Sequence, residues 1–401
     1  MAMAGDHKMD TALFSWIDDA VSHAGAGPAF DDLVERLKRE KQYGSVLNAR
    51  LMEKRLELGL PLMSQPAIDA VPPELRQPYQ DAYVQAAREV GELFLADGNI
   101  PAAWPYFRAV GDVARIAEAL DRIDVEAGAG TESPERLGAT IHVAFQEGAH
   151  PRKGFELILK HYGMCRAVTL FGAYPAQAGR DESLRLLVRS LHGEIVENLT
   201  RTIAEVEGVR PASASIAALV EGRDWLFENN AQYTDTSHLA ALLRFCMELD
   251  DPAALRQAVE MADYACLLSP MFQYSDDPPF DRAYEDRGIY LRALAGEDVD
   301  RAIAHFAAKA DGCDPDRDGF RPAEVLVELL TRLGRHGEAI RSFRRYLADA
   351  PPDQLSCPTL PQLCELAGDF DQLKEVAQEQ SDPLGYLAAA IGRRRTIDGQ
   401  R

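Results

Sequence analysis

The chain has 401 residues, 46% of them hydrophobic, so it can bury an extensive core without disulfide bonds or structural metal ions. Acidic residues outnumber basic ones by 64 to 43, which gives a formal net charge of −21 at pH 7. A surface of that charge repels phosphate backbones and anionic lipids, so nucleic acids and membranes are excluded as default partners.

The cysteines and the N-terminal residues indicate the cellular compartment of the protein. Six cysteines are scattered without any C-x-x-C pair, a pattern typical of a reduced, cytoplasmic chain. The first residues show no basic stretch followed by an apolar run, and no segment has the ~20 apolar residues that span a bilayer. We therefore expect a soluble cytoplasmic protein.

Nearly every segment has apolar residues three and four positions apart, which predicts an all-α fold. After an N-terminal segment, residues 30–58 predict two amphipathic helices broken near Gly44, followed by a proline-rich loop. Helix resumes near Leu75 and leads into a pair of helices that turns at Gly98. Pro101 suits the start of the second helix of that pair, because its missing N–H is not needed there.

The small, polar stretch 126–134 predicts a boundary between two helical lobes. Ser133 before Pro134 suits the start of the next helix. The expected organisation is an N-terminal segment (1–27), an N-terminal helical lobe (28–127), a C-terminal helical lobe (134–390) and a flexible basic tail (391–401). The C-terminal lobe is expected to contain an atypical middle module (134–230).

Residues 181–207 predict the cleanest amphipathic helix, with an apolar stripe that ends at Val206 and with Asp181 as its cap. A further helix pair is expected over residues 238–268. The segment 273–281 is a long interruption for paired helices, and loops of that kind often carry function. The last helix is expected to end near Ile391.

One spacing occurs twice in the chain. Glycine, alanine and phenylalanine follow one another at intervals of five and then four residues, at Gly98, Ala103 and Phe107 and again at Gly334, Ala339 and Phe343. The pattern is typical of two antiparallel helices joined by a tight turn, with a small residue where they touch and a large one that fills the gap. The copies lie 236 residues apart, close to seven periods of ~34 residues.

These spacings resemble those of tetratricopeptide repeats. Residues 320–351 form the best copy and close with a proline, residues 88–110 form the second, and residues 289–306 a degenerate third. The copies cover about a quarter of the chain, and residues 134–230 depart furthest from the pattern. The resemblance implies an α-solenoid, a right-handed superhelix of stacked helix pairs whose concave face binds an extended peptide or a partner helix.

The function expected from this resemblance is that of a non-catalytic interaction scaffold with a protein or peptide partner and no cofactor. The groove would be lined by the first helix of each pair, at Glu92 and Leu95 in one copy and at Glu328, Thr331 and Arg332 in the other. A homo-oligomer, in which the array packs only against itself, stays open as a further interpretation.

The atypical middle supports an alternative hypothesis, a helical metal-binding or metal-dependent enzyme module that holds a divalent transition metal. Five of the nine histidines fall in this region. The candidate ligands, which would have to converge from neighbouring helices because no H-E-x-x-H motif is present, are His142, His161, His192, His238 and Glu194.

Other chemical motifs are incomplete. Asp314, Asp316, Asp318 and Gly319 match the opening of a calcium-binding loop, but Val325 stands where that loop needs a bidentate glutamate. Nucleophile elbows and phosphate-binding glycine loops do not occur. Cys165 is expected to be a core thiol. An enzyme is therefore the less favoured interpretation.

Overall fold

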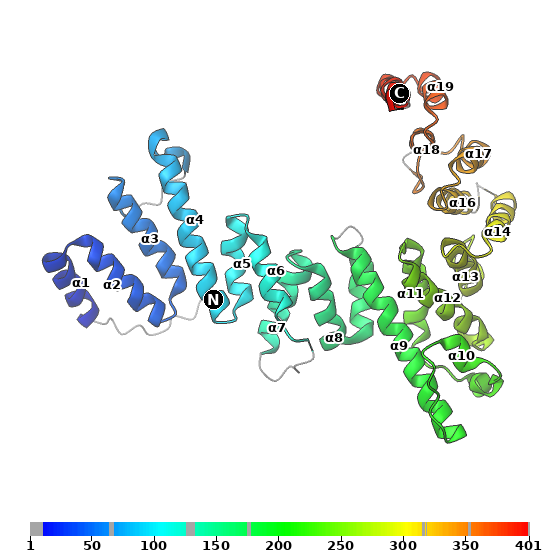
Figure 1. The fold of residues 1–401 in the computed structure, drawn as a ribbon, viewed down its shortest axis with the longest axis horizontal. Helices are drawn as coiled ribbons and strands as arrows, with labels where there is room; N and C mark the ends of the chain where they lie inside the picture. The colour runs from blue at the N-terminus through cyan, green and yellow to red at the C-terminus, as the bar shows by residue number, and fades with distance from the viewer. Residues whose placement is uncertain are drawn as a thin grey trace. The chain divides into compact units, whose positions relative to one another are not determined.

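The computed structural model describes residues 11–63, 68–125, 133–174, 178–314, 317, 319–351 and 354–399. All regular structure within these ranges is helical, which confirms the predicted all-α class (Figure 1). None of the helices described there combines the length and the apolar character needed to cross a lipid bilayer.

The contacts divide the chain into two compact units. Unit 1 takes in the described residues up to His161 together with residues 178–179, and unit 2 takes in the others, from Tyr162 onward. The division lies beside Gly163, whose φ of 75° and ψ of 178° break helix α8 (Pro151–Ala173). Most of the boundary predicted at residues 126–134 falls outside the described residues, so that boundary stays a prediction.

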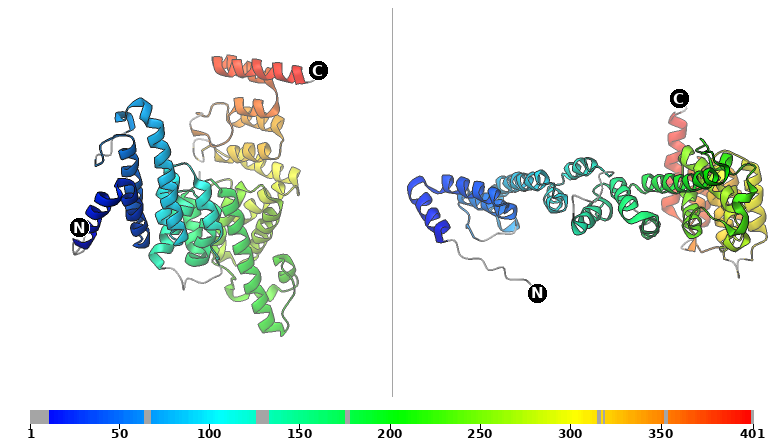
Figure 2. Two further views of the ribbon diagram at one scale, coloured as in Figure 1. Left: turned by 60° about the vertical axis from the view of Figure 1, so that its left-hand side comes forward. Right: turned by 90° about the horizontal axis from the view of Figure 1, so that it is seen from below.

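Unit 1 is a succession of helices in which each helix from α1 to α6 packs on the next, and α7 packs on α5 (Figure 2). They are α1 (Thr11–Ala24), α2 (Ala26–Arg39), α3 (Tyr43–Glu57), α4 (Pro73–Ala96), α5 (Ile100–Ala109), α6 (Val113–Asp121), α7 (Pro134–Ile141), the short elements Ile68–Ala70 and His142–Gln146, and the first part of α8. The break between α2 and α3 lies at Lys41, with φ of 58°, close to the predicted position near Gly44, which is itself part of α3. Ser133 caps α7 as expected.

Unit 2 continues with the second part of α8 and with longer-range packing, since α9 contacts α10, α11 and α12. From α11 to α20, each α-helix again packs on the next. The helices are α9 (Arg180–Glu207), α10 (Ile216–Val220), α11 (Thr236–Phe245), α12 (Pro252–Leu267), α13 (Ala283–Leu294), α14 (Val299–Asp311), α16 (Arg321–Arg332), α17 (His336–Tyr346), α18 (Leu360–Ala367), α19 (Phe370–Glu379) and α20 (Pro383–Gly399), with short helices at Asp224–Asn230, Cys246–Glu248 and Pro270–Phe272.

Three details of unit 2 differ from the sequence-based expectations. Helix α9 begins at Arg180, so Asp181 lies in its first turn and is not its cap. Val206, predicted to close the apolar stripe of α9, is 64% exposed because it lies in the last turn of the helix, beyond the buried Ile203. The predicted helix end at Ile391 is wrong, since α20 continues to Gly399.

The repeated spacing forms the predicted helix pair in both places. Gly98 and Gly334 have φ of 65° and 71°, a conformation that glycine adopts without strain, and each joins two helices. The alanines and phenylalanines that follow them are buried, namely Ala103, Ala339, Phe107 and Phe343. In the first pair the helices approach so closely that a Cβ atom at Gly91 would lie 2.5 Å from the Phe107 ring.

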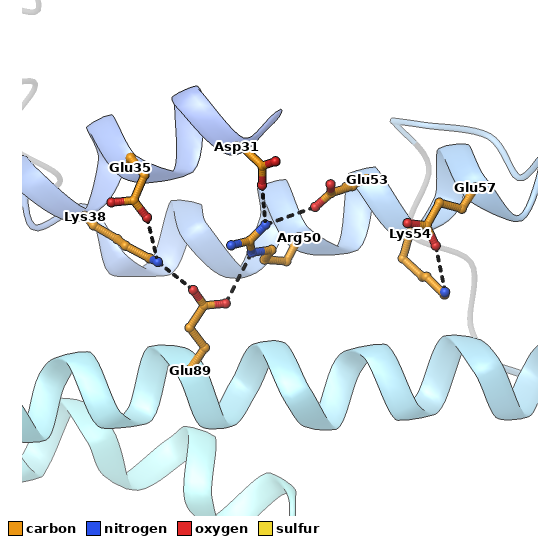
Figure 3. A network of polar contacts seen from close by, with 8 residues as sticks. All are labelled: Asp31, Glu35, Lys38, Arg50, Glu53, Lys54, Glu57 and Glu89. Atoms are coloured by element: carbon orange, nitrogen blue, oxygen red, sulfur yellow. Dashed lines mark hydrogen bonds and ion pairs between the residues drawn. The ribbon is translucent and has the colours of Figure 1, made fainter. Parts of the chain in front are cut away.

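Charged side chains tie α2, α3 and α4 together in unit 1 (Figure 3). Glu89 of α4 pairs with Lys38 Nζ of α2 at 2.9 Å and with Arg50 Nε of α3 at 3.2 Å. Arg50 also pairs with Asp31 and Glu53. Partial burial raises the pKa of Glu89, but its hydrogen bonds to the two cations outweigh this effect and hold that pKa below its ordinary value.

A Glu89→Gln variant tests this network through its pH dependence. Because the pKa of Glu89 is lower in the folded chain, its contribution is complete above the ordinary pKa of 4.5 and is lost as the pH falls through the folded value. We expect the variant to lower the stability of unit 1 at neutral pH by about 1 kcal/mol, and the difference to shrink as the pH falls below 4.5 toward the lowered pKa of the folded chain. Urea unfolding at neutral pH and at acid pH, followed through Trp104 fluorescence, measures this.

The matched control is Glu57→Gln, which removes a carboxylate that is 57% exposed and pairs only with Lys54 of the same helix. It is expected to change the unfolding midpoint little at either pH. A Glu89→Gln difference of the same size at neutral and acid pH would contradict the proposed role of the carboxylate.

Candidate partner-binding cavity

A cavity of about 670 Å³ lies in unit 2. Its walls come from α13, from α16, from the turn that follows α11, and from the loop 276–280, which belongs to the long interruption singled out in the sequence. Three of the predicted groove residues, Glu328, Thr331 and Arg332, line it together. We call it the α13–α16 cavity.

Lys309 of α14 fixes the loop that closes one side of the α13–α16 cavity. Its Nζ donates to the Pro279 carbonyl at 2.6 Å, to Asp281 Oδ1 at 2.5 Å and to Asp286 Oδ2 at 2.8 Å. Asp286 is fully buried, and its other oxygen lies 2.8 Å from His305 Nε2. The hydrogen bond from Lys309 lowers the pKa of Asp281. The loop is therefore anchored to two helices and holds its shape at neutral pH.

Arg287 of α13 is the most enclosed cation of the cavity wall. It is 2% exposed, pairs with Asp276, and lies 5.0 Å from the centroid of the Phe280 ring. Its Nε makes no hydrogen bond within the described residues. A buried donor without an acceptor costs about 1–3 kcal/mol, and because this atom is shielded from solvent the cost falls on the fold.

The predicted groove residues are placed on the cavity, but the fold already uses their polar groups. Glu328 accepts from Arg321 Nη1 at 2.9 Å. Thr331 Oγ1 donates to the carbonyl four residues earlier at 2.7 Å. Arg332 donates to carbonyls and to a carboxylate in the turn 247–250. These side chains therefore shape the cavity wall and connect α16 to the turn after α11.

Two charged groups on the cavity have no charged partner within the described residues. Arg244, in the last turn of α11, contacts only the Phe245 ring, at 5.6 Å, and Asp277 lies on the anchored loop. The remaining acid of this region, Glu248, is bound at both oxygens by Arg180, at 2.8 and 3.0 Å. Arg244 and Asp277 are thus left to contact a ligand.

The sequence-based prediction missed Arg244, Asp277 and Arg287. A signal for Arg287 exists, because Glu285, Asp286 and Arg287 are three consecutive charged residues, which cover more than one face of helix α13, so some of them must face the core. Buried charges are costly unless they are paired, so such a run indicates a site or a structural ion pair. Arg244 and Asp277 stand out because no oppositely charged side chain among the described residues lies beside them. That depends on residues distant in the sequence, so the local sequence does not show it.

The other two predicted groove residues lie in unit 1. Glu92 of α4 accepts from Arg115 Nε at 2.7 Å and from Arg115 Nη2 at 2.8 Å, so both of its oxygens are occupied. Leu95 is half-buried and packs against the core cluster that contains Phe107. Both residues therefore have a structural role in the first helix pair.

The predicted metal ligands have separate surroundings. His142 Nε2 lies 3.5 Å from Glu147 Oε1 on the surface. His192 is buried, and its Nε2 lies 2.9 Å from Glu260 Oε2. Each of these histidines has one carboxylate beside it, which is too few ligands for a structural zinc site.

The remaining candidate ligands are likewise placed apart. Glu194 accepts from Thr234 Oγ1 at 3.0 Å, His238 lies near the N-terminal cap of α11, and His161 is half-exposed on α8. Within the described ranges, no three histidine, cysteine, aspartate or glutamate side chains are gathered as a metal site requires.

The structure describes Cys165 and part of the calcium-loop motif that the sequence analysis considered. Cys165 is exposed, so its predicted place in the core is wrong. Val325 is completely buried in α16 and offers no ligand to a calcium ion. Asp316 and Asp318 of the acidic loop lie outside the described residues.

The α13–α16 cavity therefore provides binding groups of both charges next to apolar side chains. Burial raises the pKa of Tyr290 in its wall to about 12, so this phenol keeps its proton at neutral pH.

No family model matches the chain, and comparisons with curated proteins and with solved structures found no significant match. The function is accordingly argued from this geometry.

Proposed function

We propose that unit 2 is an interaction scaffold that binds an extended peptide segment of a partner protein in the α13–α16 cavity. Helices α13 and α16 both contribute side chains to the same cavity, and the proposal takes them as the first members of successive helix pairs, in keeping with the repeated spacing of the sequence. This arrangement is what a tetratricopeptide-like solenoid with a concave binding face requires, and we include that architecture in the proposal.

The observation that carries the proposal is the pattern of charges on the cavity. Its lining contains four arginines and four carboxylates, and most of them are paired within the fold. Arg244 and Asp277 are not paired with any described residue, and the Nε of Arg287 has no acceptor there.

The complementary ligand is a segment with an acidic side chain for Arg244, a basic one for Asp277, and an apolar residue between them. Met247 and Phe280 supply apolar surface for that residue. Small-molecule pockets are predominantly apolar with few polar groups, and this strongly charged lining suits a peptide better.

Selection from a displayed peptide library tests the proposal. The wild type is expected to enrich peptides with one acidic and one basic position at a fixed spacing. The Arg244→Glu/Asp277→Lys variant exchanges the two free charges and is expected to enrich the inverted pattern. Peptides selected on the wild type should bind the variant at least about tenfold more weakly, which corresponds to about 1.4 kcal/mol.

The matched control is Arg344→Glu/Asp349→Lys, which exchanges two exposed charges of unit 2 outside the cavity. It should select the same peptides as the wild type. Selection of one motif by the wild type and by the cavity variant alike, or no charge pattern in any selection, would rule out the proposed site.

A further inference from the structure

A second cavity in unit 2, of about 740 Å³, has a different character. Arg185 and Arg189 of α9 line it, one helical turn apart, and Arg256 of α12 lies on it as well. The segment 213–215 before α10 and the side chain of His192 complete its wall. We call it the α9–α12 cavity.

The carboxylates of the α9–α12 cavity are used by the fold. Glu260 accepts from Ser215 Oγ at 2.8 Å and from the backbone N–H of Ile216 at 2.9 Å, and its Oε2 also lies 2.9 Å from His192 Nε2. Asp251 caps α12 by accepting from the N–H of Ala254 at 2.8 Å. These contacts hold α9, α10 and α12 together, and both carboxylates keep their negative charge on the cavity wall.

The three arginines, in contrast, make no hydrogen bond or ion pair with any described residue. Arg185 and Arg189 are four residues apart on one helix face, so their like charges repel each other. The chain has a net charge of −21, and other arginines of unit 2 form ion pairs with carboxylates. Arg180 pairs with Glu248, and Arg223 pairs with Glu207. The lining of the α9–α12 cavity therefore holds three arginines without a direct partner among the described residues, against the two carboxylates of Asp251 and Glu260, and so has an excess of positive charge.

We propose that the α9–α12 cavity binds a phosphate monoester. Guanidinium groups recognise phosphate with paired, charge-assisted hydrogen bonds. A monoester carries about −1.5 to −2 charges at neutral pH, which matches several cations better than one carboxylate does. Ser213 and Gln257 on the same wall add neutral donors. The phosphoryl group comes either from a phosphorylated side chain of a partner or from a free phosphorylated small molecule.

Isothermal titration calorimetry of the full chain tests the proposal with three probes: inorganic phosphate, O-phosphoserine, and a phosphoserine peptide with its unphosphorylated counterpart. The wild type should bind the phosphorylated probes saturably at one site, and more weakly as salt is added. The Arg185→Gln/Arg189→Gln/Arg256→Gln variant should lose at least about tenfold in affinity.

The control is Arg166→Gln/Arg341→Gln/Arg344→Gln, which removes the same charge from exposed positions of unit 2 away from this cavity. It should bind as the wild type does. If the triple variant does not fold, Arg256→Gln alone, at an exposed position, is measured in its place and should also weaken binding.

The probes distinguish the two sources of phosphate. Binding of the phosphopeptide at least tenfold tighter than that of O-phosphoserine assigns the site to a phosphorylated partner, and equal or weaker peptide binding assigns it to a free small molecule. The proposal is overturned if the wild type binds none of the phosphorylated probes, or if the control variant loses as much affinity as the cavity variant. It does not depend on peptide binding in the α13–α16 cavity.

Discussion

Replacing Asp286 with alanine is expected to lower the free energy of unfolding of unit 2 by about 3 kcal/mol, the lower end of the range for breaking a buried ion pair. Asp286 is fully buried between Lys309 and His305, so the variant would remove the carboxylate beside His305 and one of the three acceptors of Lys309. Lys309 keeps Asp281 and the Pro279 carbonyl as partners, which limits the loss.

Hydrogen-exchange mass spectrometry is the suitable measurement, because it reports opening of unit 2 without assuming that the whole chain unfolds in one step. Faster exchange should begin in the loop 276–280 and extend into α13 and α14. The matched control is Asp281→Ala, which removes the other carboxylate on Lys309. That carboxylate is 57% exposed, so the control should cost less than about 1 kcal/mol.

If Asp286→Ala and Asp281→Ala destabilised unit 2 equally, the burial of Asp286 would not account for the stabilising effect of its ion pair with Lys309. If neither did, the loop would be held by its own turn contacts, such as the hydrogen bond from the Asp276 N–H to the Phe280 carbonyl. Either result would remove the argument that Lys309 and Asp286 shape the α13–α16 cavity.

The second large effect is expected from the phenylalanines of the repeated spacing. Phe107→Ala and Phe343→Ala each leave a void between two closely packed helices, and truncation of a buried phenylalanine costs about 3–5 kcal/mol. Phe107 is 1% exposed and Phe343 is 7% exposed. We expect Phe107→Ala to speed hydrogen exchange in α4 and α5 of unit 1, and Phe343→Ala to do so in α16 and α17 of unit 2.

Val206→Ala is the control for this pair of variants. The apolar pattern of α9 places Val206 in the core, but it is 64% exposed, so its truncation should change stability by less than about 0.5 kcal/mol. A small effect at Phe107 or Phe343 would show that the repeated spacing does not mark the packing centre of each helix pair.

These residues show what could be predicted about the fold. The interval between Gly98, Ala103 and Phe107 lies within one helix pair, and the turn, the close contact and the filled gap all depend on residues fewer than about 20 positions apart. That is why the two pairs were located correctly. The burial of Val206 was predicted wrongly, because the exposure of a side chain at a helix end depends on whether another element covers it.

The candidate site could be predicted only in part. Glu328, Thr331 and Arg332, predicted to line a partner-binding groove, lie together on one cavity, and their role in binding stays a prediction. The partners of these residues were not predicted, because Arg332 bonds to the turn 247–250, more than 80 residues earlier in the chain. Which charges remain free on a surface is decided by such long-range pairs.

By itself, the sequence determined the all-α class, the helix pairs and the glycine turns, because helical periodicity and backbone conformation are local properties. The tertiary structure alone decided which charges are paired and which have no partner among the described residues. Arg185 and Arg256 are far apart in the sequence, and only the packing of α9 on α12 places them on one cavity. Electrostatic interactions depend on distance in space, and the fold sets that distance.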